Sequence, residues 1–331
     1  MHTDEVREAR ERSEILSGNR LTAPTERRQL AYILAPSYTG STLLTFLLSK
    51  HQDIATVGEL KGTARGDLNT YPCSCGALQR ECRFWKQLQE EMDKDGAPLS
   101  LEDFGTHFQA DSFLPDRLLR AGVRGPFFET ARDLMLRRLP GCRRRLEEVV
   151  ERNRRIIELI CTLQGGTTFL DGSKDPIRLK LLAAAGHWDV KVIYLIRDGR
   201  GATNSYMRHN GVGMDRAAAE WARTHRECDR MVREPGLAGI TIRYEELCRR
   251  PEETMAEIYA FLGLDMGRTD DATDHHILGN QMRLNSLAEI PGDRVRSSAW
   301  SAGSGAASRR SPACSRRPGR WSSTPMPSAP S

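Results

Sequence analysis

Two short segments, far apart in the chain, contain side chains that could bind an anionic ligand. The first ends in Gly40, Ser41 and Thr42, which combine a glycine that lets the backbone approach an anion with two hydroxyl donors. The second contains Arg197, whose planar guanidinium can donate two parallel hydrogen bonds to a phosphate, with Ser205 a little further along. Either segment alone could bind a phosphate, whereas the pair predicts a ligand with two separated anionic groups.

A strand and a helix must position the first segment. Residues 31–35 form an apolar run that is too short for a helix and is bounded by Pro36, which indicates a buried strand. Apolar residues after Ser41 predict a largely buried helix, whose N-terminal N–H groups favour an anion. The loop is not a Walker A loop, because Gly40 stands where that motif has lysine. An ordinary helix with a Ser or Thr cap is the alternative interpretation.

The second segment repeats this arrangement. Residues 191–196 predict a strand, and Arg197 follows at its carboxyl end, where open α/β sheets bind ligands. A helix that starts near Gly199 would place Ser205 about two turns along, so that its hydroxyl could face the same anion. Alternatively, Arg197 pairs with Asp198 or caps a carbonyl group, and Ser205 is merely exposed.

Both segments resemble motifs of the sulfotransferases that use 3′-phosphoadenosine 5′-phosphosulfate (PAPS). The 5′ loop of that family, usually P-[RK]-S-G-T-T, is similar to residues 38–42, except that Tyr38 replaces the basic residue. The 3′-phosphate motif of the family, R-D-x-R-x-x-x-x-S, is matched by Arg197, Asp198, Arg200 and Ser205. Ordered matches of this kind are more specific than one motif alone.

Four further segments extend the resemblance, in the family's order, over about residues 29 to 290. Glu59 ends a G-E pair that follows the first helix in many members, and Lys174 begins a K-D-P element known from protein-tyrosine sulfotransferases. Tyr244 begins a segment similar to the Y-E-D-L near the adenine, and residues 275–283 resemble the late nucleotide loop. The resemblance assigns the nucleotide contacts to Tyr38, Thr39, Gly40, Ser41, Thr42, Arg197, Ser205, Tyr244, Asn280 and Arg283.

The resemblance implies an in-line displacement with a loose transition state, in which positioning and electrostatics do most of the work. It makes Glu59 the general base for an acceptor hydroxyl and lets Lys174 stabilise negative charge on the sulfuryl group. Alternatively, Glu59 is a surface or capping carboxylate, and Lys174 pairs with Asp171 or Asp175. Because Tyr38 is uncharged, either Lys174 supplies the positive charge or catalysis is weaker than in the family.

The implied co-substrate is PAPS, and no metal is required because protein cations can hold the nucleotide phosphate that leaves. The acceptor would be a hydroxyl of a sugar, a lipid, a peptide tyrosine or a natural product; the sequence indicates neither which one nor the oligomeric state. Two other functions stay open. One is a nucleotide-binding or regulatory protein without turnover, suggested by Tyr38. The other is a P-loop kinase, against which the loop without lysine and the lack of a clear Mg²⁺-binding strand both argue.

The order of predicted elements indicates an α/β domain over residues 29–294. We expect a P-loop NTPase-like fold, with a central parallel sheet of about five strands flanked by helices. Residues 85–164 form a helical stretch, broken near Gly96, Gly125 and Pro140, and are expected to be a cap that binds the acceptor. The mixed arginines and glutamates of residues 143–155 favour a solvated helix face over an anionic-acceptor patch.

Composition bounds the class of protein. The 331 residues, 39% of them hydrophobic, can bury a full core, and the net charge of +5 suits an anionic ligand without requiring nucleic acid. No apolar run is long enough to span a membrane, and the charged residues 1–28 lack the apolar core of a secretory signal. We therefore expect a cytoplasmic protein. The Ser-, Arg- and Pro-rich residues 295–331 are expected to be disordered.

Most of the eight cysteines are expected to be reduced. Cys73, Cys75 and Cys82 form a C-x-C-G-x5-C pattern, which is not the spacing of a zinc ribbon and leaves a fourth ligand to come from elsewhere. We favour a cluster of packed thiols, or a bridge formed under oxidation, over a structural zinc. The histidines, His275 and His276 included, show no ligand spacing and are expected to be surface or hydrogen-bonded residues.

Overall fold

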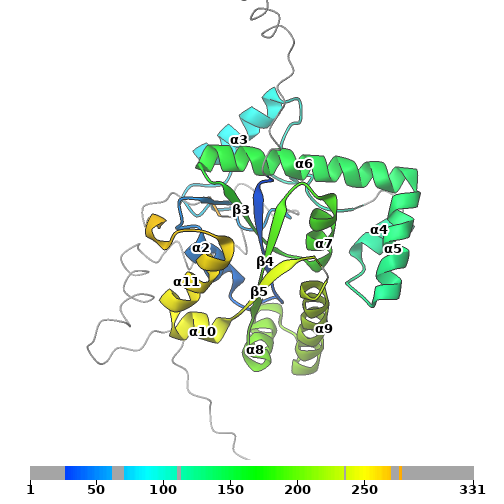
Figure 1. The fold of residues 1–331 in the computed structure, drawn as a ribbon, viewed down its shortest axis with the longest axis vertical. Helices are drawn as coiled ribbons and strands as arrows, with labels where there is room; N and C mark the ends of the chain where they lie inside the picture. Colours follow the sequence, from blue (N-terminus) through cyan, green and yellow to red (C-terminus); the bar gives the residue numbers. More distant parts are fainter. Residues whose placement is uncertain (1–26, 62–70, 110–112, 235, 270–275, 278–331) are drawn as a thin grey trace, which may run out of the picture.

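The computed structural model of the protein describes residues 27–61, 71–109, 113–234, 236–269 and 276–277. It contains a five-stranded sheet in which all strands are parallel, in the order β2-β3-β1-β4-β5 (Figure 1). The strands are β1 (Gln29–Leu34), β2 (Ile54–Thr56), β3 (Thr168–Lys174), β4 (Asp189–Ile196) and β5 (Ala238–Arg243). The predicted parallel sheet of about five strands is confirmed.

Prolines mark where several helices begin. Pro126, Pro140, Pro176 and Pro251 lie in the first turns of α5, α6, α7 and α11, where the missing N–H would have had no intrahelical partner. The helices are α2 (Ser41–Leu48), α3 (Arg83–Lys94), α4 (Phe113–Arg120), α5 (Pro126–Arg138), α6 (Pro140–Gln164), α7 (Pro176–Ala185), α8 (Gly199–Asn210), α9 (Met214–Val232), α10 (Tyr244–Arg249) and α11 (Pro251–Leu262), followed by the 3-10 turn η1 (Met266–Arg268).

Alternate residues of the central strand β1 face two separate hydrophobic clusters. Leu30 and Tyr32 pack in the cluster that includes residues of α3, α6 and α7. Ala31 and Ile33 pack in the cluster formed with α2 and α11. Figure 1 shows α7 on one side of the strands and α2 and α11 on the other. Because successive side chains of a strand point to opposite faces, a fully apolar strand requires helices on both faces of the sheet.

The helical stretch between β2 and β3 consists of α3 to α6, and its breaks at Pro126 and Pro140 are confirmed. The first break is longer than predicted: residues 95–109 form no helix or strand, yet they bury Phe104 and Phe108 in the core. Strand β3 extends as far as Lys174, the first residue of the K-D-P element. In the described part of the chain, no helix is long and apolar enough to cross a bilayer.

Candidate active site

The loop between β1 and α2 presents backbone N–H groups at the carboxyl edge of the sheet. Gly40, with φ +94°, precedes α2 and has no side chain to accept from the N–H groups of the first helical turn. Ser41 is buried and Thr42 half-buried in that turn. Thr39 is buried, and its hydroxyl donates to the carbonyl of Pro36 at 2.8 Å, which fixes the loop from inside. An anion could therefore bind at the N-terminus of α2.

Tyr38, which stands where the family has a basic residue, packs against α8. Its hydroxyl accepts a hydrogen bond from the Asn210 amide at 2.9 Å, and its ring meets the edge of the Tyr206 ring, 5.4 Å between centroids. Its backbone is left-handed, with φ +65°, which is unfavourable for a side chain of this size. The residue thus places an uncharged ring on the β4 side of the loop.

Arg197 joins the two segments that the sequence singled out. Its guanidinium donates to the carbonyl of Tyr38 at 2.9 Å and to the Ser205 hydroxyl at 3.4 Å. Of the two alternatives considered for Arg197, the bond to a carbonyl group is present. The ion pair with Asp198 is not formed. Asp198 instead accepts from the Arg200 backbone and side chain, and this bond lowers the pKa of Asp198 to about 2.

Tyr244, at the start of α10, covers the same place. The guanidinium of Arg197 lies 4.6 Å from the centroid of the Tyr244 ring. A Cβ atom added to Gly40 would lie only 2.4 Å from that ring, so no larger residue fits there without displacing it. Segments from β1–α2, β4–α8 and β5–α10 therefore meet at one point. Of the predicted nucleotide contacts, Asn280 and Arg283 lie outside the described residues.

Glu59 and Lys174 meet on the opposite side of the loop. Glu59 follows β2, and its carboxylate forms an ion pair with the ammonium of Lys174 at the end of β3. Lys174 has φ +64°, and within the described residues it and Tyr38 are the non-glycine residues with positive φ. Backbone strain of this kind is concentrated at functional sites. The predicted alternative partners of Lys174, Asp171 and Asp175, are paired elsewhere.

An irregularity of β3 accounts for the position of Lys174. Tyr32 of β1 pairs with Asp171 of β3, but Leu34 pairs with Lys174, so β3 contains one extra residue between these points. The N–H of Gly172 donates to the carbonyl of Gly58 at 2.7 Å, which ties the irregular segment to the residue before Glu59. Bulges often redirect side chains beside active sites.

A buried polar network, which the sequence analysis missed, lies beneath this bulge. Asp171 accepts from the guanidinium of Arg178 at 2.9 Å and from the hydroxyl and N–H of Ser173, and Asp171 and Arg178 are almost fully buried. Arg178 also donates to the Thr106 carbonyl at 2.7 Å and to the Asn153 amide oxygen at 2.6 Å. The network thus links β3 to residues of the helical stretch.

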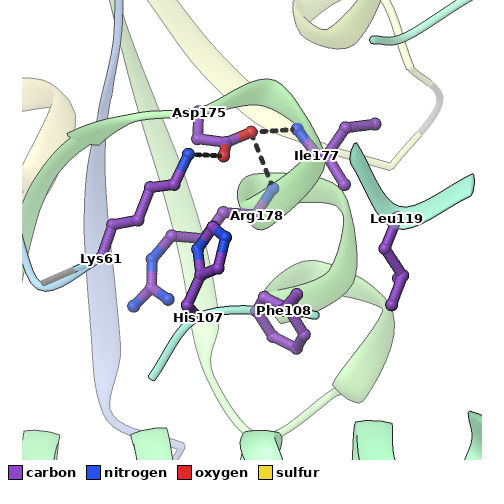
Figure 2. Close-up of a pocket in the computed structure, with 7 residues that line it drawn as sticks. All are labelled: Lys61, His107, Phe108, Leu119, Asp175, Ile177 and Arg178. Atoms are coloured by element: carbon purple, nitrogen blue, oxygen red, sulfur yellow. Dashed lines mark hydrogen bonds and ion pairs between the residues drawn. The ribbon is translucent and has the colours of Figure 1, made fainter. Parts of the chain in front are cut away.

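A pocket of about 230 Å³ is lined by residues close in the chain to Glu59 and Lys174 (Figure 2). Asp175 and Lys61 line it and form an ion pair at 2.6 Å. His107, Phe108 and Leu119 of the helical stretch line the other side, as Figure 2 shows. Its mixed polar and apolar lining is suited to a small organic molecule.

The structure is that of an α/β protein with a cationic side chain, Arg197 or Lys174, on each side of the loop after β1. The model of the Sulfotransferase family matches residues 32–268, and the chain belongs to this family. Membership supports sulfuryl transfer as the class of reaction and a sulfonate donor as co-substrate. Among curated proteins there is no match.

Solved structures of bacterial sulfotransferases are similar to the chain at low identity. The sulfotransferase domain from the curacin biosynthetic pathway is 18% identical, with a TM-score of 0.41, over 73% of this chain and 76% of that chain. Sulfotransferase STF9 from Mycobacterium avium is 18% identical, with a TM-score of 0.39, over 81% of this chain and 69% of that chain.

Proposed function

We propose that the protein transfers a sulfuryl group from PAPS to a hydroxyl group of an acceptor. The observation that carries the proposal is the position of the first loop between two different groups. Since β1 lies between β3 and β4, the Glu59–Lys174 pair is on one side of the loop and Arg197 on the other. This matches a nucleotide with a sulfated 5′-phosphate and a separate 3′-phosphate.

In this proposal the 5′-phosphosulfate lies at the N-terminus of α2, where the N–H groups after Gly40 stabilise its charge. The 3′-phosphate binds the guanidinium of Arg197 and the hydroxyl of Ser205, which are already in contact with each other. Tyr244, whose ring lies beside Arg197 and Gly40, contacts the nucleoside between the two phosphate sites. Asn280 and Arg283 are proposed to complete the nucleotide site, as the family resemblance implies.

The chemistry is a displacement at sulfur. The acceptor oxygen forms a bond to sulfur while the bond from sulfur to the 5′-phosphate oxygen breaks, and 3′,5′-adenosine bisphosphate leaves. Glu59 takes the acceptor proton, and Lys174 stabilises the charge that develops on the sulfuryl group and the leaving oxygen. Because Tyr38 is uncharged and packs on α8, the cation of this step is assigned to Lys174 and not to the loop.

The pocket of Figure 2 is proposed as the acceptor site. Asp175 in its lining directly follows Lys174 in the chain, and Lys61 closely follows Glu59. An acceptor bound there would therefore be near the transferring group. Its apolar side comes from the helical stretch, in agreement with the proposed role of residues 85–164 as an acceptor cap.

Calorimetric binding of 3′,5′-adenosine bisphosphate and of 5′-AMP tests the two-anion site. We expect the bisphosphate to bind more tightly, and Arg197→Ala to weaken it by about 10- to 100-fold, the value of a lost charged hydrogen bond. Arg233→Ala is the matched control, because Arg233 is exposed, paired with Asp229 and outside both motifs. Equal binding of both nucleotides by the folded wild-type protein would contradict the proposal.

The absence of a basic residue at Tyr38 favours a second candidate function, that of a nucleotide-binding protein without turnover. The loop then binds the nucleotide, but without a basic residue it fails to stabilise the leaving group. Incubation with PAPS and a panel of hydroxyl acceptors distinguishes the two functions. Tight bisphosphate binding without sulfated product in the wild type, together with sulfated product from a Tyr38→Lys variant, would select the binding protein.

A further inference from the structure

Three cysteines and one histidine from distant parts of the chain converge at a place that the proposed reaction does not use. The ligand atoms of Cys73, Cys75, Cys82 and His276 all lie within 4.8 Å of one another. Nδ1 of His276 is 3.3 Å from the sulfur of Cys82 and 3.6 Å from that of Cys73. The sulfurs of Cys75 and Cys82 are 3.6 Å apart.

These separations match the edges of a tetrahedron around a zinc ion. With Zn–S bonds of about 2.3 Å and Zn–N bonds of about 2.0 Å, a tetrahedral site has S···S edges of about 3.8 Å and S···N edges of about 3.5 Å. A disulfide between Cys75 and Cys82 would need sulfurs about 2.05 Å apart. The three separations given above therefore fit zinc ligands, the remaining ones are at most 4.8 Å, and the Cys75–Cys82 distance is too long for a covalent bridge.

The backbone holds the three thiols without help from the histidine. Between Cys73 and Cys82 the chain folds back on itself, with the Cys73 N–H donating to the Ala77 carbonyl at 2.8 Å. Gly76, with φ +91°, donates to the Cys73 carbonyl at 3.0 Å and makes the turn between the first two cysteines and the third possible. Cys82 immediately precedes α3, which fixes the third sulfur.

The histidine is positioned by contacts of its own. Its ring stacks on Phe84 of α3, with centroids 4.5 Å apart and ring planes within 3°. The N–H of the next residue, Ile277, donates to the Ser74 hydroxyl at 2.8 Å, and the Ile277 side chain is buried. Two independent contacts therefore hold His276 so that Nδ1 faces the sulfurs.

We propose that Cys73, Cys75, Cys82 and His276 bind one structural zinc ion. Three thiolates and an imidazole in tetrahedral array are a donor set typical of zinc, and four protein ligands leave no position for a reactant. Packing of thiols alone does not account for the cluster, because Cys75 is exposed and an imidazole nitrogen lies among the sulfurs. The ion fastens residues 276–277 to the loop before α3, independently of the proposed transfer reaction.

The test is the metal content of the full chain, purified under reducing conditions without chelator and measured by inductively coupled plasma mass spectrometry. We expect about one zinc per chain in the wild type and almost none in His276→Ala or Cys82→Ser. His187→Ala, at an exposed histidine, and Cys248→Ser, at a half-buried cysteine in α10, are the matched controls and should keep the zinc.

A second measurement covers the case in which the ligand variants fail to fold. Wild-type protein, stripped of metal and then titrated with Co²⁺, should develop the intense visible bands of tetrahedral cobalt and a thiolate charge-transfer band, saturating at one equivalent. A folded wild-type protein that contains no zinc and shows no such spectrum would overturn the proposal. A Cys75–Cys82 disulfide found by mass spectrometry in that same reduced preparation would also overturn it.

Discussion

The two sides of the first loop are built in different ways. On the β4 side, Arg197 and Ser205 come from one strand–helix unit and contact each other directly. On the β3 side, Glu59 follows β2 and Lys174 ends β3, and Lys174 is held by a bulge above the buried pair of Asp171 and Arg178. The first arrangement is local, whereas the second depends on segments distant in the chain.

This difference has a consequence for mutations. Substitutions on the β4 side should weaken nucleotide binding and leave the rest of the fold intact. Substitutions beneath the β3 side should disturb both the Glu59–Lys174 pair and the stability of the domain, because the buried network of Asp171 and Arg178 supports both. Three predictions for the β3 side test this difference.

The largest effect is expected for Glu59→Gln. If Glu59 is the general base, the substitution lowers kcat by about 10²- to 10⁴-fold, since the amide cannot accept the acceptor proton. The affinity for 3′,5′-adenosine bisphosphate should stay unchanged, because the β4 side is untouched. Initial rates of product formation and calorimetry measure the two quantities. Glu253→Gln, at an exposed carboxylate of α11, is the control, and a kcat for Glu59→Gln equal to that of the control would remove Glu59 from the mechanism.

The next effect concerns stability. Arg178→Ala leaves the carboxylate of Asp171 buried without its cation, which should lower the free energy of unfolding by about 3–5 kcal/mol. For a domain of this size that corresponds to a fall in Tm of roughly 6–20 °C in a thermal melt. Arg143→Ala, which removes an exposed pair with Glu147 on α6, should change Tm little. Similar melts for both variants would show that the network does not support the β3 side.

The smallest effect is a dependence of the free energy of unfolding on pH, which comes from Asp175 in the lining of the pocket. Burial raises the pKa of Asp175, but the ion pair with Lys61 and the N–H groups of Ile177 and Arg178 outweigh it, so the pKa lies below its ordinary 3.8. A depressed pKa means that ionised Asp175 stabilises the fold above about pH 4, and that this stabilisation is lost as the pH falls further.

Asp175→Asn keeps an oxygen for the helix N–H groups but loses the charge. We expect the variant to be less stable by about 1 kcal/mol at pH 7, because the pair with Lys61 is partly exposed to solvent. The difference in Tm between wild type and variant should shrink as the pH is lowered from 5 to 3. A difference that stays constant over this range would show that the charge of Asp175 does not matter.

Much of the fold was predictable because its signals are local. The apolar run before Pro36, the strand before Arg197 and the helix after Gly199 follow from short stretches of sequence, and the structure contains each of them. The contact between Arg197 and Ser205 was also predictable, since both lie in one motif with helical spacing.

The rest could not be predicted because it depends on pairing between distant residues. Nothing in the spacing of Arg178 indicates that it reaches Asn153 and the Thr106 carbonyl, and these contacts exist only once α6 is packed on the sheet. Lys174 pairs with Glu59 and not with Asp171 or Asp175, which are nearer in the sequence. This pairing likewise depends on the bulge.

The buried contacts of Arg178 also bear on how the protein unfolds. Asn153 lies within α6, and Thr106 lies in the long break before α4, so one side chain of α7 ties both to β3. Opening of α6 alone would take the Asn153 acceptor away from a buried guanidinium, which would keep its bonds to Asp171 and to the Thr106 carbonyl but lose one charged hydrogen bond. The helical stretch is therefore fastened to the sheet through α7, and because Arg178 also lines the pocket, the contacts that hold α6 and residue 106 in place hold one wall of the pocket as well.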